Sequence, residues 1–196
     1  MDAFTHLSKE KQHKILNAAL ICYGKNGYEK TSIADIAVEA GISKASVFQY
    51  FGSKQALYLY LFQFSCDRIL ESMPIGTEDF FECIQLGAEA KLQVMAQYPG
   101  MYAFLSTAVT EETPAAYQLQ QRLEAQAQAA PQLLAQVQWN RFKPGFDRTK
   151  VTQIIGWVND GYVRANAGSK DADTMRWELW EYMELLKQVL YREEYQ

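Results

Sequence analysis

The sequence predicts an all-α fold, and three observations support this prediction. Apolar residues recur every three or four positions through most of the 196 residues, which is the period of an amphipathic helix. Residues that favour helix starts, among them Ser8, Ser43 and Asp147, precede these periodic segments, and glycine or proline follows several of them. No segment forms a convincing β-strand. We therefore expect nine or ten helices, arranged as an N-terminal three-helix head with a helix-turn-helix and a C-terminal helical bundle.

The helix-turn-helix is expected over residues 31–54. Its first helix carries Ser32 and Asp35 in the spacing of a capping box, and it ends at Gly41, where a left-handed conformation costs glycine little. Ser43 can cap the second helix. Two short helices joined by a tight turn that contains glycine are the signature of this motif.

Helices on either side of the motif are expected to support it. A first helix over residues 8–26 ends at Gly27 and packs its apolar side on the motif. Ser53 caps a fourth helix that extends to about residue 72 and connects the head to the rest of the chain.

The sequence predicts a bundle of further helices in the C-terminal part. We expect them over residues 77–97, 101–109, 113–137, 147–166 and 171–191, with the last one starting at Asp171 or Asp173. The third of these begins at Thr113-Pro114 and keeps its apolar spacing through Pro131. Proline removes a backbone donor, so we predict a bend or two shorter helices there.

Composition and charge narrow the class of protein. Hydrophobic residues make up 48% of the chain and charged residues 21%, which is ordinary for a globular protein. No apolar run approaches the length of a membrane helix, and the polar N-terminus does not resemble a signal peptide, so we expect a cytoplasmic protein. The net charge is −4, but residues 1–60 alone carry seven Lys and five acidic residues. This local positive charge favours a nucleic-acid partner for the head.

Cysteine and histidine usage predicts no metal site or other cofactor. Cys22, Cys66 and Cys83 are too scattered for a C-x-x-C motif, and their odd number argues against a disulfide framework. His6 and His13 would lie about 10 Å apart along a helix axis, which is too far for one metal ion. We therefore expect buried thiols and no cofactor.

The N-terminal segment 15–57 resembles the DNA-binding domain of TetR-type (TetR/AcrR-like) transcriptional regulators. The resemblance rests on residues in the order and spacing typical of that family: Ala18-Ala19, Tyr23, Gly27-Tyr28, Thr31-Ser32, Ile36-Ala37, Ala40-Gly41-Ile42-Ser43, Tyr50-Phe51 and Ser53-Lys54. It implies a DNA-binding domain over residues 1–53 and a ligand-binding and dimerisation domain over residues 54–196. It also implies a homodimer that binds a palindromic operator in double-stranded DNA and is released by a small-molecule effector.

The second helix of the motif, residues 43–51, is the expected recognition helix. If Val47 and Phe51 face inward, helical periodicity leaves an outward set of five: Lys44, Ala45, Ser46, Phe48 and Gln49. In the major groove lysine can donate to guanine, glutamine can pair with adenine, and Ala45 or Phe48 can contact a thymine methyl. The family resemblance places Ser32, Ser46, Tyr50 and Lys54 at phosphate contacts.

Two further sets of residues are expected in the C-terminal part. The candidate effector pocket is aromatic and comprises Tyr102, Phe104, Tyr117, Trp139, Phe142, Trp157 and Tyr162. The candidate dimer interface comprises a stripe of branched and small residues and a stripe of longer ones: Val151, Ile154, Val158, Gly161 and Ala165, with Leu179, Met183, Leu186 and Leu190. In the alternative interpretation, both sets simply close the protein's own core.

Two other classes of protein were weighed. An enzyme is disfavoured because the chain lacks the common nucleophile, zinc-protease and phosphate-loop motifs, and its acidic pairs have no histidine beside them. A helical interaction or ligand-sensing module with weak or lost DNA binding remains the alternative, because the positive charge of the head is mild. DNA binding separates it from a regulator.

Overall fold

The computed structural model describes residues 2–73, 77–108, 110–113, 117–118, 134–166 and 169–196. Within these ranges the chain forms nine α-helices and two short 3₁₀ helices, and the β-structure is limited to one isolated bridge between Phe142 and Tyr191. The predicted all-α fold is confirmed. The chain divides into two compact units, residues 1–71 with 93–129 (unit 1) and residues 72–92 with 130–196 (unit 2).

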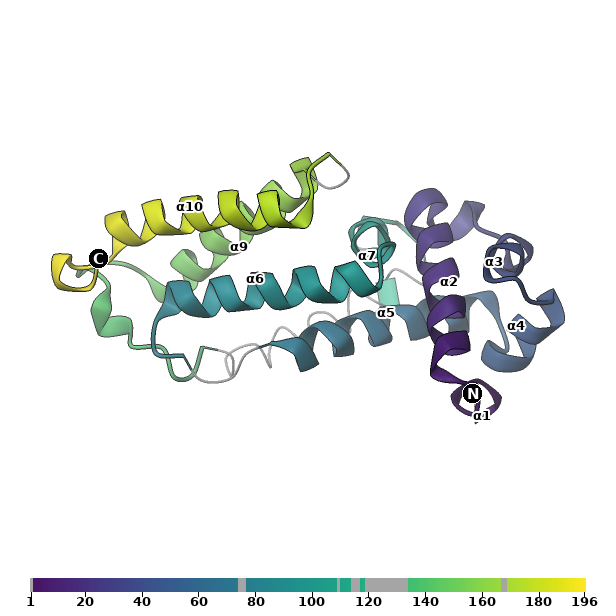
Figure 1. Cartoon of the computed structure of the whole chain (residues 1–196). Helices are drawn as coiled ribbons and strands as arrows, with labels where there is room; N and C mark the ends of the chain where they lie inside the picture. The colour runs from purple at the N-terminus through teal and green to yellow at the C-terminus, as the bar shows by residue number, and fades with distance from the viewer. Residues whose placement is uncertain (1, 74–76, 109, 114–116, 119–133, 167–168) are drawn as a thin grey trace. The chain divides into compact units, whose positions relative to one another are not determined.

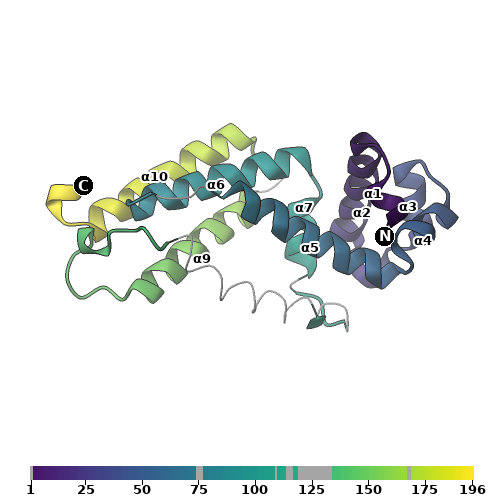
Figure 2. The same ribbon diagram turned by 90° about the horizontal axis from the view of Figure 1, so that it is seen from below.

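Unit 1 contains the helix-turn-helix (Figures 1 and 2). Its helices are α1 (Asp2–Thr5), α2 (Lys9–Lys30), α3 (Ile33–Ala40), α4 (Lys44–Phe51), α5 (Lys54–Ser72) and α7 (Met101–Ala108). The short helix α1 was not predicted. The first long helix was expected to end at Gly27, and helical geometry does stop there, with φ 75° and ψ 178°; a further short helical stretch follows this kink and extends α2 to Lys30.

Local capping fixes the ends of these helices as the sequence predicted. Ser8 precedes α2 and accepts a hydrogen bond from the backbone N–H of Lys11. Ser53 accepts one from the backbone N–H of Ala56 at the start of α5, over 3.0 Å. These side-chain acceptors satisfy amides that have no partner within the helix.

An aromatic core joins the helices of unit 1. Tyr23 of α2, Tyr58 of α5 and Phe104 of α7 are fully buried, and their ring centroids lie 5.0–6.2 Å apart. Helix α7 approaches α2 closely, since a Cβ atom on Gly100 would lie 2.6 Å from the backbone nitrogen of Ile21. Helix α7 therefore packs directly on α2, the helix that supports the motif.

Unit 2 is built from three long helices and the segments that close one end of them. They are α6 (Phe80–Gln97), whose residues 93–97 belong to unit 1, α9 (Arg148–Asn166) and α10 (Ala172–Leu190). Figures 1 and 2 show α6, α9 and α10 side by side. The predicted Asp147 cap is confirmed, since Asp147 accepts a hydrogen bond from the Lys150 backbone N–H; of the two predicted starts of the last helix, Asp171 is the one that caps it, by accepting from the Thr174 backbone N–H. The helix predicted over residues 113–137, with its bend at Pro131, falls almost entirely outside the described residues.

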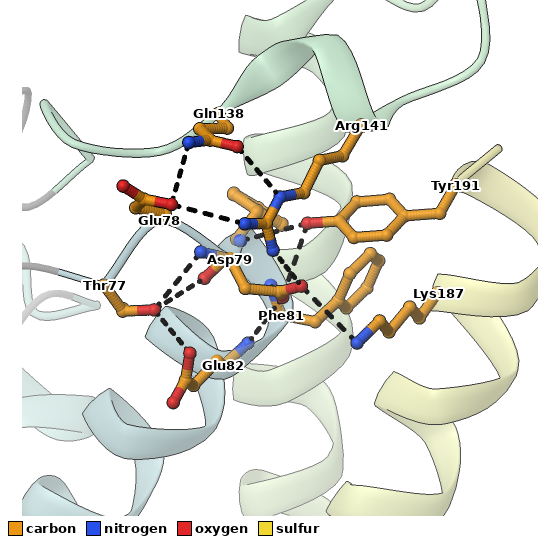
Figure 3. Close-up of polar contacts among 10 residues, drawn as sticks. Thr77, Glu78, Asp79, Phe81, Glu82, Gln138, Arg141, Lys187 and Tyr191 are labelled. Carbon is orange, nitrogen blue, oxygen red and sulfur yellow. Dashed lines mark hydrogen bonds and ion pairs between the residues drawn. The ribbon is translucent and has the colours of Figure 1, made fainter. Parts of the chain in front are cut away.

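The start of α6 differs from the prediction because a buried aspartate caps it. We expected the helix to begin at Thr77, but Asp79 accepts hydrogen bonds from the backbone N–H groups of Phe81 and Glu82, so the helix begins at Phe80. Figure 3 shows the polar cluster around Asp79, in which Arg141, Lys187 and Tyr191 converge on its carboxylate. This cluster ties the start of α6 to the 3₁₀ helix Trp139–Arg141 and to the end of α10.

Candidate DNA-binding site

The two helices of the motif are held by their own caps. Ser32 and Asp35 form the predicted capping box at the start of α3. Gly41 takes the left-handed conformation at its end, with φ 66°. Ser43 accepts a hydrogen bond from the backbone N–H of Ser46 and so caps α4. These local contacts define the ends of both helices and the turn between them.

One face of α4 is left open to solvent. Val47 and Phe51 are buried, as expected, and pack with the core of unit 1. Lys44, Ala45 and Gln49 are exposed, and the Phe48 side chain is 42% exposed. The structure therefore exposes four of the five residues that helical periodicity placed in the outward set, and the fifth, Ser46, is half-buried. Their contact with DNA bases remains a prediction.

The open face combines a cation with an aromatic ring. Lys44 Nζ lies 5.9 Å from the centroid of the Phe48 ring, near the limit of a cation–π contact. Ser46 is half-buried, and its hydroxyl lies 2.8 Å from the Ser43 hydroxyl. The face has one amide, one ammonium and two apolar groups, which matches the kinds of contact that base edges accept.

The Ser32 hydroxyl, predicted to contact a phosphate, is already hydrogen bonded within the chain. It donates to Asp35 Oδ2 over 2.7 Å and accepts from the Asp35 backbone N–H. The hydrogen bonds from the Ser32 side chain and backbone hold the pKa of Asp35 below its ordinary value. An ionised carboxylate therefore lies beside Ser32, at the position where the family resemblance implies a contact with a DNA phosphate.

Tyr50 and Lys54 are both half-buried and held in defined positions. The Tyr50 ring centroid lies 6.1 Å from that of Phe4. Lys54 Nζ donates to the backbone oxygen of Glu29 over 3.2 Å and lies 4.5 Å from the centroid of the Tyr28 ring. An ammonium group has three donors, so these contacts leave Lys54 able to donate to a phosphate.

The residues that position Lys54 were missed by sequence reasoning. Tyr28 enters the sequence analysis only as part of the family pattern, and no sequence motif singles out Glu111, which accepts a hydrogen bond from the Tyr28 backbone N–H. The two residues are 83 positions apart, and no local pattern connects them.

The aromatic residues predicted to line an effector pocket occupy different environments. In unit 1, Phe104 is fully buried in the core, Tyr102 is half-buried and Tyr117 is exposed. In unit 2, Trp139 and Phe142 stack with ring centroids 5.4 Å apart. The remaining two lie on α9, where Trp157 is 69% exposed and the Tyr162 hydroxyl donates to Glu178 over 2.7 Å.

Unit 2 contains a small cavity lined by other residues, from α6, α9 and α10. Its wall is mostly apolar and also includes Gln85, Glu89, Asn159 and Arg176. Two buried atoms of this lining, Asn159 Oδ1 and Arg176 Nε, have no hydrogen-bond partner. None of the seven predicted aromatic residues lines this cavity.

The residues predicted for a dimer interface divide into two groups. Val151, Leu179 and Met183 are buried inside unit 2, and Val158, Leu186 and Leu190 are partly buried against the same core. Ile154, Gly161 and Ala165 are exposed on α9. The stripe on α10 thus closes the protein's own core, which was the alternative interpretation, while the solvent-facing side of α10 carries another set: Trp177, Trp180, Tyr182, Leu185 and Val189.

Comparison with known proteins identifies the head. Residues 15–61 match the family described as bacterial regulatory proteins, tetR family. The transcriptional regulator RutR of Escherichia coli K12 is 35% identical over 91 residues, which cover 45% of this chain and 43% of RutR. The fatty acid metabolism regulator protein of Bacillus subtilis is 28% identical over 65 residues, or 33% of this chain and 34% of that protein. The matches therefore span less than half the length of these relatives.

Solved structures share the fold over nearly the whole chain. A TetR-family regulator from Chloroflexus aurantiacus matches with a TM-score of 0.66 and 21% identity over 98% of this chain and 99% of its own. The ketosteroid regulator KstR2 of Mycobacterium tuberculosis matches with a TM-score of 0.69 and 18% identity, and the match covers 96% of this chain and 98% of KstR2. FadR of Bacillus subtilis, solved with stearoyl-CoA, matches with a TM-score of 0.61 and 18% identity, and the match covers 87% of this chain and 96% of FadR.

No helix within the described ranges combines the length and apolar character required to cross a membrane. The helix-turn-helix that the structure shows is the one that the family match covers, and the all-helical fold is that of the solved regulators. The head of this chain, over residues 15–61, thus matches the tetR family of bacterial regulatory proteins, and the chain has the fold of solved regulators of that family.

Proposed function

We propose that this protein is a ligand-responsive, DNA-binding transcriptional regulator. In our proposal it is a cytoplasmic repressor that leaves a palindromic operator when a small molecule binds its C-terminal part. The observation that carries the proposal is the open face of α4, with Lys44, Phe48 and Gln49 directed to solvent from a capped helix-turn-helix. A helix presented in this way fits the major groove of DNA.

The operator contact requires two copies of the chain. A single small head buries too little surface for specific regulation, whereas a symmetric dimer reads two half-sites. Support comes from the outer faces of α9 and α10, where Ile154, Trp157, Trp177 and Leu185 are all at least 49% exposed. Exposed apolar side chains in such number are typical of a protein–protein interface. We propose that the second copy covers them.

An effector would bind among the helices of the C-terminal part. The described cavity in unit 2 supports this idea, because Arg176 Nε offers an unsatisfied donor and Asn159 Oδ1 an unsatisfied acceptor beside apolar walls. Ligand sites commonly combine a few such polar groups with an apolar lining. Among proteins of the same fold, FadR of Bacillus subtilis was solved with stearoyl-CoA. The aromatic residues predicted from the sequence remain a second candidate lining.

The relatives with matching heads are transcriptional regulators, and a regulatory role without an enzymatic one is the proposal here. The alternative is a helical module that senses a ligand or a partner and has lost DNA binding. This alternative rests on the modest positive charge of the head. The DNA titration described next decides between the regulator and the module.

The test is a salt-series titration of the full chain with DNA fragments that flank its own gene, with its mass in solution measured alongside. The proposal expects saturable binding of a dimer to a palindromic fragment, with an affinity that falls steeply as salt rises. The double variant Lys44→Ala and Gln49→Ala should lose the preference for that fragment and keep weak binding to all DNA. A well-folded dimer that prefers no fragment at low salt would favour the interaction module.

A further inference from the structure

We propose that Glu111, which lies just beyond α7 and outside the matched head, is a positioning residue for DNA binding. Through Tyr28 it sets the place of the Lys54 ammonium group. This inference rests on the proposed function, because Lys54 is a DNA contact only if the head binds DNA. The residues that carry it all belong to unit 1.

The Glu111 carboxylate bridges two elements of the head with short hydrogen bonds. Oε1 accepts from the backbone N–H of Tyr28 over 2.6 Å, and Oε2 accepts from the Tyr58 hydroxyl over 2.6 Å. Hydrogen bonds to an ionised acceptor are stronger than neutral ones. One side chain therefore joins the C-terminal turn of α2 to α5.

Gly27 leaves room for this contact. A Cβ atom there would lie 2.4 Å from Glu111 Oε1, and the φ of 75° is one that other residues rarely adopt. The bend at Gly27 turns the next N–H toward the carboxylate. The deviation from helical geometry thus coincides with the point at which Glu111 binds.

Tyr28 transmits this position to Lys54. Its ring lies 4.8 Å from the Tyr58 ring in an edge-to-face contact and carries the Lys54 ammonium 4.5 Å above its centroid. The same ammonium donates to the backbone oxygen of Glu29, the residue that follows Tyr28. Both contacts of Lys54 Nζ therefore depend on where Tyr28 and its neighbour are held.

Glu111 is itself fixed by α7. Its backbone N–H donates to the Thr107 oxygen over 3.1 Å, and the Thr107 hydroxyl donates to the Gly24 oxygen of α2 over 3.3 Å. Because α7 belongs to the C-terminal part of the chain, the DNA-facing geometry of the head depends on a residue outside it. Residues 1–53 alone would lack this contact.

The experiment compares Glu111→Ala, Glu111→Gln and the exposed neighbour Glu112→Ala in the full chain. Glu111→Ala should lower affinity for the operator roughly eightfold at 0.1 M salt and flatten the salt slope by about 0.9, the loss of one phosphate contact. Glu111→Gln should restore most of both, since its amide can accept from Tyr28 and donate to the Tyr58 oxygen. Glu112→Ala should leave both unchanged.

A double-mutant cycle separates positioning from general stability. Lys54→Ala alone should match the loss caused by Glu111→Ala, and the double variant should lose little more. Additive losses, or a lower melting temperature with an unchanged salt slope, would overturn the proposal. If the wild type binds no DNA, the rate at which an acylating reagent modifies Lys54 still tests whether Glu111 holds the Lys54 ammonium group in place. That rate should rise about twofold or more in Glu111→Ala alone, and an unchanged rate refutes the inference.

Discussion

Asp79 Oδ2 lies 3.1 Å from Arg141 Nη1 and 3.4 Å from Lys187 Nζ, so one carboxylate joins three segments of unit 2 that are distant in sequence. Its other oxygen caps α6 and lies 3.4 Å from the Tyr191 hydroxyl (Figure 3). Asp79 is buried, with an exposed fraction of 8%. Two cations and several donors thus converge on a single acidic group at the closed end of the helices.

Replacing this carboxylate should destabilise unit 2 strongly. Asp79→Ala removes the α6 cap and leaves Arg141 and Lys187 without their partner, and breaking a buried ion pair costs about 3 kcal/mol or more. Chemical denaturation followed by tryptophan fluorescence measures the loss. Asp173→Ala is the control, because its pair with Arg176 is exposed and should contribute little. Equal effects of the two variants would contradict the role given to Asp79.

The stability of unit 2 should also depend on pH through Asp79. Burial opposes ionisation, but the hydrogen bond from Glu82 and the contacts with Lys187 and Arg141 outweigh it and lower the pKa from 3.8. A carboxyl with a lower pKa when folded stabilises the fold above its unfolded pKa, and the gain disappears as pH falls through the folded value. Wild-type stability should therefore drop below about pH 4, and Asp79→Asn should show a smaller drop. Identical acid profiles would exclude the effect.

Gln49 should contribute to sequence preference rather than to general affinity. Its side chain is exposed on the open face of α4, where an amide can pair with adenine. Gln49→Ala is expected to reduce discrimination at one operator position by about 1–3 kcal/mol and to leave the salt slope unchanged. Competition titrations with single-base operator variants measure this. A uniform loss at every position would remove Gln49 from base contact.

The local features of the head could be predicted because their causes are local. The Ser32–Asp35 capping box, the left-handed Gly41 and the Ser43 cap depend on residues within a few positions of one another. Periodicity also identified Val47 as buried, since the side of a short helix next to its partner is fixed by the turn. Sequence patterns of this range determine most of the candidate DNA-binding site.

Features that depend on distant contacts could not be predicted. Helix α6 begins three residues later than expected because Arg141 and Lys187, far along the chain, hold Asp79 in the capping position. Helix α10 is apolar on two sides, and periodicity does not say which side the core takes. Met183 faces the core and Leu185 faces solvent. A dimer interface at Met183 would require Met183 to face solvent instead.

Two glycines, Gly100 in the turn before α7 and Gly156 within α9, should respond to alanine with opposite signs. A Cβ atom on Gly100 would lie 2.6 Å from the Ile21 backbone, so Gly100→Ala should separate α7 from α2 and cost about 1–3 kcal/mol. A Cβ atom on Gly156 in α9 meets no atom within 4 Å, so Gly156→Ala should stabilise the helix by up to about 1 kcal/mol. Thermal unfolding of both variants measures the difference, and two losses of equal size would argue against the close helix contact.

The exposed side of α9 and α10 should control assembly without affecting the fold. Trp157 is 69% exposed and Leu185 58% exposed, so charged substitutions there cost little within one chain. In the proposed dimer, Trp157→Glu with Leu185→Glu places like charges in a dry interface and should give a monomer at micromolar concentration. Sedimentation measures the mass, and the exposed Lys25→Glu in α2 is the control. A monomeric variant with native helix content and weaker operator binding is expected, because one head alone then reads a half-site. A variant that remains a dimer would place the interface elsewhere on the chain.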